Sequence, residues 1–179
     1  RTQEKSLAPN IPAAALRQFI AGKWEDGDGA ELTSGNPARP EETVAAGRQA
    51  TAEQLERSVS AASEAAAAWA AVPMHERGAV LLRAAALLEG SAGDLGLELA
   101  REEGKTLAEG RGEVARAAQI LRYYGNEGDR SAGEVFSSPR RGEQILVVRK
   151  PLGVVGVVTP FNFPIAIPAW KIAPALVYG

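Results

Sequence analysis

The sequence predicts an α/β protein in which a mainly helical segment precedes the beginning of a parallel sheet. Between residues 51 and 126, apolar residues recur three and four positions apart, which is the period of an amphipathic helix. Residues 153–158 (GVVGVV) then form a continuous apolar run, which is typical of a parallel strand buried on both faces. The composition is that of a globular protein, because 45% of the 179 residues are apolar and 23% are charged.

The N-terminal part of the chain is expected to contain only short strands. Residues 1–16 are largely polar at first and then contain two prolines, so we expect a loose arm. Residues 18–21 run into Gly22, which predicts a short hairpin, and residues 43–47 predict another short strand. The region between them is rich in glycine and proline and is expected to be mostly loop.

A first helix is predicted to begin at Thr51, because Thr51 and Gln54 form the two ends of a capping box. Pro73 is expected to end this helix, since proline has no backbone N–H to donate. The apolar residues predicted to share one face of the helix are Leu55, Val59, Ala62, Ala66 and Trp69.

Three more helices are predicted before residue 127. One spans about residues 76–88, and the next runs from Ser91 to Gly104. A second capping box at Thr106 opens the last of them, which extends to about Asn126. Its residues predicted to face inward are Val114, Ala117, Ala118, Leu121 and Tyr124.

The C-terminal part is predicted to form a strand, a second strand, a loop and a helix. The strands are residues 144–149 and residues 153–158, and the helix is residues 165–178. This order indicates the opening of a doubly wound α/β domain. Since ligands of such sheets bind beyond the carboxyl ends of the strands, the loop of residues 159–164 is the expected site.

Composition excludes several classes of function. A net charge of −2 argues against nucleic acid or an anionic membrane as the main partner. No apolar stretch is suited to crossing a membrane and residues 1–12 contain no secretory signal, so a cytoplasmic location is expected. Without cysteine and with His75 as its one histidine, the sequence predicts no disulfide, no metal centre and no thiol nucleophile of its own.

Two charged motifs in the sequence do not indicate a functional site. Gly104, Lys105 and Thr106 match the end of a P-loop, but Leu99 stands where its first glycine is required. The acidic residues Glu98, Glu102, Glu103, Glu109 and Glu113 alternate with basic residues on the predicted helices. This pattern predicts a solvated face held by salt bridges.

Asn162 is the strongest candidate for chemistry. It lies between Phe161 and Phe163, within a loop bounded by Pro160 and Pro164. A neutral amide N–H in this position can stabilise an oxyanion that develops on a substrate. The alternative is that Asn162 is buried and satisfies the backbone of a turn.

These residues resemble the aldehyde dehydrogenase superfamily. Its members carry a Pro-aromatic-Asn-Phe-Pro signature, here residues 160–164, followed by a Trp-Lys-x-x-Pro-Ala-Leu helix, here residues 170–176. Residues 150–156, residues 19–24 and the Glu-Gly-Lys step at 103–105 match as well, in collinear order over about residues 17–179. The run TPFNFPIAIPAWKIAPAL is most similar to that of the 2-oxoglutarate-semialdehyde (2,5-dioxovalerate) dehydrogenases.

The resemblance implies that an aldehyde, in particular a semialdehyde, is oxidised to a carboxylic acid. In this family a cysteine thiolate attacks the aldehyde, a hydride passes to NAD or NADP, and a glutamate-activated water releases the acid. By motif position, Asn162 would belong to the oxyanion hole, and Lys171 would have a structural or proton-relay role near it. Residues implied to line the nicotinamide side of the cofactor site are Val158, Thr159, Pro160 and Phe161, and those implied to wall the substrate tunnel are Phe163 and Trp170.

The same resemblance implies a division of the chain and a partner. Residues 17–135 would be the mainly helical part of the cofactor-binding domain, residues 136–152 an oligomerisation strand, and residues 153–179 the first β-loop-α unit of its Rossmann-like sheet. The complete protein would be a homo-oligomer, a dimer or a tetramer. Because the sequence lacks cysteine, it is expected to be the N-terminal portion of such an enzyme. The alternative is a truncated, catalytically inactive product that acts as an interaction or structural module.

Overall fold

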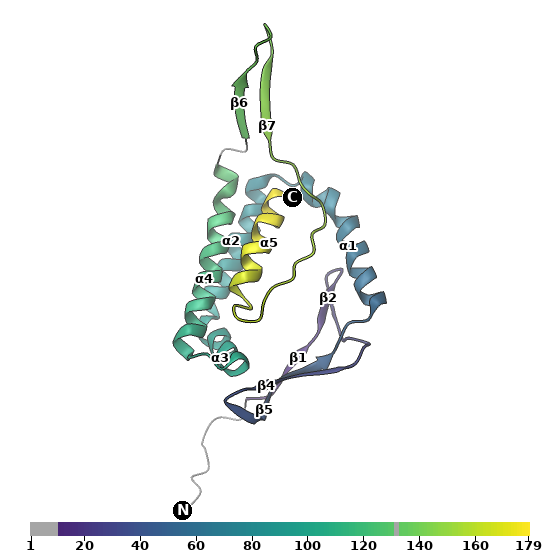
Figure 1. Ribbon diagram of the computed structural model, residues 1–179, viewed down its shortest axis with the longest axis vertical. Helices are drawn as coiled ribbons and strands as arrows, with labels where there is room; N and C mark the ends of the chain where they lie inside the picture. The colour runs from purple at the N-terminus through teal and green to yellow at the C-terminus, as the bar shows by residue number, and fades with distance from the viewer. Residues whose placement is uncertain (1–10, 131–132) are drawn as a thin grey trace, which may run out of the picture.

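The computed structural model describes residues 11–130 and 133–179, and its strands and helices follow one another in blocks along the chain (Figure 1). The strands are β1 (Ala14–Leu16), β2 (Gln18–Ile20), β3 (Lys23–Glu25), β4 (Glu31–Asn36), β5 (Arg39–Arg48), β6 (Gly133–Ser137) and β7 (Gln144–Val148). The helices are α1 (Ala52–Ala71), α2 (Met74–Gly90), α3 (Ala92–Glu103), α4 (Leu107–Gly125), the 3-10 helix η1 (Asn126–Asp129) and α5 (Ala166–Tyr178). The α/β class predicted from the sequence is confirmed.

The N-terminal strands form a small sheet and a separate hairpin. The sheet has the order β1-β5-β4, with β1 parallel and β4 antiparallel to β5. The predicted hairpin at residues 18–24 is confirmed as β2 and β3, joined by Ala21 and Gly22, which both have positive φ. Such a two-residue turn matches the twist of its strands.

Part of the expected N-terminal arm is ordered. Residues 1–10 lie outside the described residues, but Ala14–Leu16 form β1, which pairs with residues 45–47 of β5. Gly47 permits this pairing, because a Cβ at that position would lie 2.4 Å from the carbonyl oxygen of Leu16. The sequence analysis did not anticipate this strand, since its three residues carry no alternating pattern.

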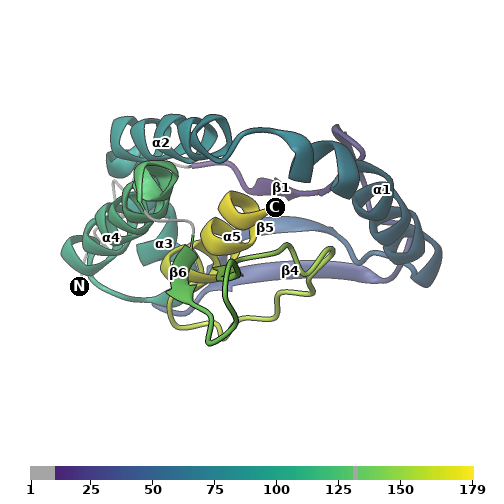
Figure 2. The ribbon, with the colours of Figure 1, turned by 90° about the horizontal axis from the view of Figure 1, so that it is seen from above.

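The helical core lies between α2, α4 and α5 (Figures 1 and 2). All four helices predicted between residues 51 and 126 are confirmed, and both capping boxes form. The inward face predicted for α4 is buried except at Tyr124, which is half-buried. The buried apolar side chains shared by these helices are Leu81, Ala85, Ala117, Ala118, Ile120, Leu121, Ala166, Ala169, Ala173 and Val177.

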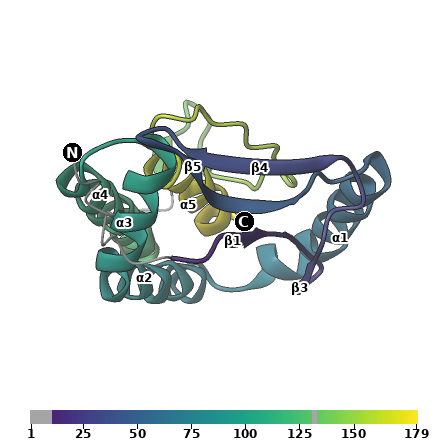
Figure 3. The same cartoon turned by 90° about the horizontal axis from the view of Figure 1, so that it is seen from below.

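Glycines allow the helices to approach closely. A Cβ on Gly110 of α4 would lie 2.3 Å from the Gly96 carbonyl oxygen of α3, and one on Gly78 of α2 would lie 2.3 Å from that of Gly125. α3 in turn lies beside β4 and β5 (Figure 3), where Arg101 pairs with Glu42 at 2.7 Å. The helical layer and the N-terminal sheet are thereby joined.

Two apolar parts of the chain lack the burial that their composition suggests. On α1, Leu55 and Val59 of the predicted apolar face are 59% and 47% exposed. The strand predicted at residues 144–149 is confirmed as β7, which pairs with β6 in a hairpin that projects from the helices (Figure 1). Its residues are exposed on both faces.

The prediction of a buried strand at residues 153–158 is wrong. This segment is irregular, and Val158 is 97% exposed. A strand forms only where another strand supplies hydrogen bonds, and among residues 11–130 and 133–179 no strand pairs with this segment. Within the same described ranges, no helix is long and apolar enough to cross a membrane.

Candidate functional site

The loop that carries Asn162 lies against the junction of α3 and α4. Phe161, Asn162 and Pro164 line one side of a cleft of ≈ 730 Å³. The opposite side is formed by residues of β4, the turn after it and the junction, namely Ser34, Gly35, Pro37, Glu102, Glu103, Gly104 and Lys105. The sequence motif around Asn162 and the Glu-Gly-Lys step therefore meet at one depression, although about 60 residues separate them along the chain.

Asn162 is exposed and presents its side chain without a partner. Within the part of the chain that the structure describes, its amide makes no hydrogen bond, and its backbone carbonyl accepts one from Lys105 Nζ at 3.3 Å. The alternative of a buried asparagine that satisfies a turn is therefore wrong for this structure. The free amide N–H groups can serve a ligand in the cleft instead.

The α3–α4 junction places Lys105. Gly104 ends α3 in the left-handed conformation (φ 78°), which glycine adopts without strain. Thr106 begins α4 two residues later, with its hydroxyl accepting from the backbone N–H of Glu109. Lys105 is thus fixed between two helix ends, and its ammonium lies 5.0 Å from the centre of the Phe163 ring.

Two carboxylates hold the Lys105 ammonium. Nζ lies 2.5 Å from Glu113 Oε2, in a hydrogen bond, and 2.6 Å from Glu103 Oε2, in an ion pair without hydrogen-bond geometry. Burial lowers the pKa of Lys105, but the interactions of its ammonium with Glu103 and Glu113 outweigh burial and raise the pKa above its ordinary value. Lys105 is therefore protonated at neutral pH.

Glu113 corrects the prediction of a solvated acidic face. Its side chain is only 1% exposed, whereas Glu98, Glu102 and Glu109 are exposed as predicted. Oε1 of Glu113 accepts hydrogen bonds from the backbone N–H groups of Ile165 (2.8 Å) and Ala166 (3.2 Å). A signal was present in the sequence, because Glu113 stands four positions before the inward-facing Ala117.

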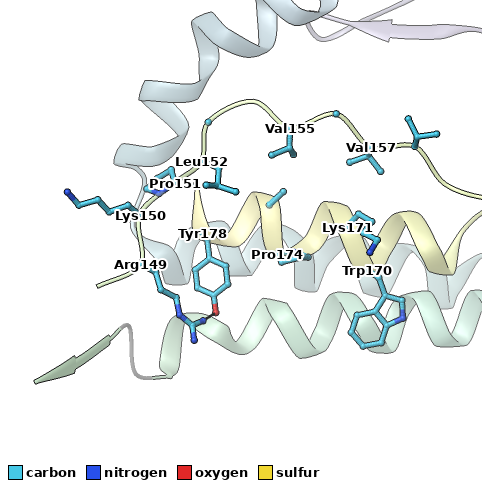
Figure 4. Close-up of a pocket in the computed structure, with 15 residues that line it drawn as sticks. Arg149, Lys150, Pro151, Leu152, Val155, Val157, Trp170, Lys171, Pro174 and Tyr178 are labelled. Carbon is cyan, nitrogen blue, oxygen red and sulfur yellow. Dashed lines mark hydrogen bonds between the residues drawn. The ribbon is translucent and has the colours of Figure 1, made fainter. Parts of the chain in front are cut away.

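Three other predicted site residues lie along a groove of ≈ 760 Å³ between α5 and residues 149–158 (Figure 4). Val158, Trp170 and Lys171 line this groove. The Trp170 ring packs edge-on against the Tyr124 ring, with 6.2 Å between the two ring centres. Thr159 and Pro160 connect the groove to the cleft.

Phe163 and Trp170, which are expected to wall the substrate tunnel, have different neighbours in this structure. Phe163 lies over the Lys105 ammonium, and Trp170 lies against α4 with the Arg116 guanidinium 5.3 Å from its ring centre. The structure thus brings Phe161 and Asn162 to the cleft, and Val158, Trp170 and Lys171 to the groove.

A polar cluster missed by the sequence analysis lies at the end of the groove. The Tyr178 hydroxyl donates to Glu127 Oε1 at 2.5 Å and accepts from Arg149 Nη1 (Figure 4). Burial, and then Glu127, raise the pKa of Tyr178. In the described residues no group of three or more histidine, cysteine or acidic side chains is arranged to hold a metal ion.

The comparisons with known proteins agree with the motifs. A sequence model described as the aldehyde dehydrogenase family matches residues 24–179. The chain is 44% identical over 162 residues to the alpha-ketoglutaric semialdehyde dehydrogenase of Bacillus subtilis, covering 90% of this chain and 33% of the relative. It is 37% identical to the 2,5-dioxopentanoate dehydrogenase of Saccharolobus solfataricus, covering 90% of this chain and 34% of the relative.

The fold is also similar to that of a solved structure. The NADP-dependent glyceraldehyde-3-phosphate dehydrogenase from Bacillus halodurans C-125, complexed with NADP, superposes with a TM-score of 0.86 at 32% identity. The match covers 94% of this chain and 36% of that one. The chain therefore spans about a third of the length of the curated relatives and of the structure that it matches.

Proposed function

Because this chain belongs to the aldehyde dehydrogenase family, we propose that it is the N-terminal portion of an NAD(P)-dependent enzyme that oxidises an aldehyde to a carboxylic acid. The proposed substrate class is a semialdehyde such as 2,5-dioxopentanoate. This choice is supported by the 44% and 37% identity to two relatives named for that activity.

The observation that carries the proposal is the state of the Asn162 side chain. It is exposed at the cleft, and none of the described residues accepts a hydrogen bond from its amide N–H groups. When a thiolate attacks an aldehyde, the carbonyl oxygen becomes negatively charged, and a pre-oriented neutral donor stabilises that charge more than it stabilises the substrate. We assign this role to Asn162.

The thiolate would come from outside this sequence, which contains no cysteine. This chain would contribute the oxyanion donor and parts of the walls. Phe163 and Trp170 supply half-exposed aromatic surface for the substrate side. Lys171, which lines the groove next to Trp170, is proposed as a further polar residue near the reacting groups.

The residues before Asn162 present apolar surface that suits the planar face of an aromatic ring. Val158 is 97% and Phe161 87% exposed, so both present apolar surface without cover, and Thr159 and Pro160 link them. We propose that these four residues contact the nicotinamide side of NAD or NADP. When bound, this cofactor supplies the hydride acceptor.

The β6–β7 hairpin supports the proposal that the complete protein is a homo-oligomer. Its exposed apolar side chains are Val135, Phe136, Ile145, Leu146, Val147 and Val148. A projecting hairpin whose apolar side chains are exposed is suited to packing against a second copy. A cytoplasmic location remains a prediction from the sequence.

The proposal is tested by Asn162→Ala in the full-length protein, assayed by NAD(P)+ reduction with 2,5-dioxopentanoate. Loss of an oxyanion donor is expected to lower kcat by about 100-fold or more while the protein stays folded. Asn126→Ala is the matched control, because Asn126 is also exposed but its amide donates to the Arg122 carbonyl. Full turnover by Asn162→Ala, or an equal loss in the control, would remove Asn162 from this role.

A further inference from the structure

We propose that Glu113 and Lys105 are positioning residues that hold the loop around Asn162 in its productive shape. This inference rests on the proposed function of Asn162. Glu113 is buried, and the ammonium of Lys105, which lines the cleft, is held by two carboxylates. Both act through the backbone and ring that flank Asn162.

Glu113 fixes the C-terminal end of the loop. Its Oε1 accepts from the N–H groups of Ile165 and Ala166, which open α5, and its Oε2 accepts from Lys105. A single side chain of α4 therefore holds both the start of α5 and the α3–α4 junction. An isolated charge buried to 1% exposure would be strongly destabilising, and these three donors compensate it.

Lys105 fixes the residues in the middle of the loop. Its ammonium donates to the Asn162 carbonyl oxygen at 3.3 Å and lies 5.0 Å from the centre of the Phe163 ring. It thus contacts the backbone of the functional residue and the side chain of its neighbour. Because Gly104 and Thr106 set the place of Lys105 from the two helix ends, the loop is held to a rigid part of the fold.

The arrangement points to positioning more than to stability alone. A buried ion pair is often no more stabilising than apolar residues of similar volume. Stability alone therefore does not explain why this pair is present. An oxyanion donor, by contrast, acts only if it is held within a fraction of an ångström. The network joins loop, junction and helix start at the one place where such accuracy is needed.

The experiment combines kinetics with hydrogen exchange in the full-length enzyme. Glu113→Ala removes every acceptor, Glu113→Gln keeps one acceptor for the two amides, and Lys105→Met removes the donor to Asn162. We expect kcat to fall by about 10- to 100-fold in Glu113→Ala and Lys105→Met, and by less in Glu113→Gln, with smaller changes in KM. Amide exchange at Ile165 and Ala166 should quicken in Glu113→Ala, and less in Glu113→Gln.

The control is Glu89→Ala, which removes an exposed ion pair with Arg122, and which should leave kcat and exchange unchanged. The decisive measurement is the same set of changes in an Asn162→Ala background. If Glu113 and Lys105 act through Asn162, their loss should then lower kcat by less than about twofold.

The possible outcomes separate the two proposals. Equal losses of kcat in both backgrounds, or full kcat in Glu113→Ala while Asn162→Ala is impaired, would overturn the positioning role alone. Full kcat in Asn162→Ala would overturn the proposed function itself. If Glu113→Ala does not fold, Glu113→Gln and Lys105→Met decide between the same outcomes.

Discussion

The helical core and the segment of residues 151–158 are both rich in apolar residues, yet they differ completely in burial. In the core, Val114 is fully buried and Ile120 is 2% exposed. In the segment, Leu152 is 92% and Val158 97% exposed. Composition does not distinguish the two regions.

The difference lies in where the backbone hydrogen bonds come from. A helix satisfies its own N–H and C=O groups, so an amphipathic helix needs only an apolar surface to pack against. An extended segment depends on a neighbouring strand for the same bonds. Helices α2, α4 and α5 therefore assemble within these 179 residues, whereas residues 151–158 have no pairing strand among the described residues.

The largest expected effect compares the same residue type in the core and in the exposed hairpin. Ile120→Ala should lower the free energy of unfolding by about 2–5 kcal/mol, because it leaves a cavity among α2, α4 and α5. Ile145→Ala, at a residue that is 46% exposed on β7, should lower it by about 0.5 kcal/mol or less where no second copy covers the hairpin, and by more where one does. Chemical denaturation of the full-length protein measures both.

This pair also tests whether the hairpin is an interface. If Ile145→Ala destabilises as much as Ile120→Ala, the hairpin is buried against another part of the assembly. Repeating the denaturation at several protein concentrations would identify a second copy, because the midpoint of an oligomer depends on concentration.

A smaller effect is expected from the glycines of α4. Gly110→Ala should destabilise the protein by about 1–3 kcal/mol, because the new Cβ would lie 2.3 Å from the Gly96 carbonyl oxygen and push α3 away. Gly112→Ala is the matched control two residues along the same helix, where a Cβ would meet nothing within 4 Å. That change should stabilise by about 0.5–1 kcal/mol, since alanine favours the helix. Equal effects in a thermal melt would contradict close helix packing as the source of burial.

The sequence predicted the parts of the fold that depend on local signals. Capping residues Thr51 and Thr106 begin the helices where the structure has them, and Gly104 ends α3. The pairing of β1 with β5 and the open state of residues 153–158 depend on distant segments. No local pattern in the sequence encodes which strands are available as partners.

The candidate site shows the same division. Asn162 was proposed as a site residue from its loop context, and the structure places it at the edge of a cleft. Glu113 was missed because a charged residue on an amphipathic helix is usually solvated. Its burial follows from three donors, on Lys105, Ile165 and Ala166, of which two lie about 50 residues away along the chain.

The smallest expected effect is a pH dependence that Lys105 gives to the buried region. The folded protein holds the Lys105 proton more tightly than the unfolded chain, because Glu103 and Glu113 raise its pKa despite burial. This contribution to stability is complete below the unfolded pKa of about 10.4 and is lost as pH rises through the higher folded pKa. Lys105→Met has no such proton to lose, so its urea midpoint should fall less steeply above about pH 10 than that of the parent protein. Tyr178, whose pKa is raised by burial and by Glu127, acts in the same direction in both proteins, and the difference between the two curves therefore reports Lys105. Parallel curves would mean that the stability of the buried glutamates does not depend on the Lys105 charge. The difference between the loop around Asn162, which Lys105 and Glu113 hold, and the exposed segment of residues 151–158 would then have to be explained by packing alone.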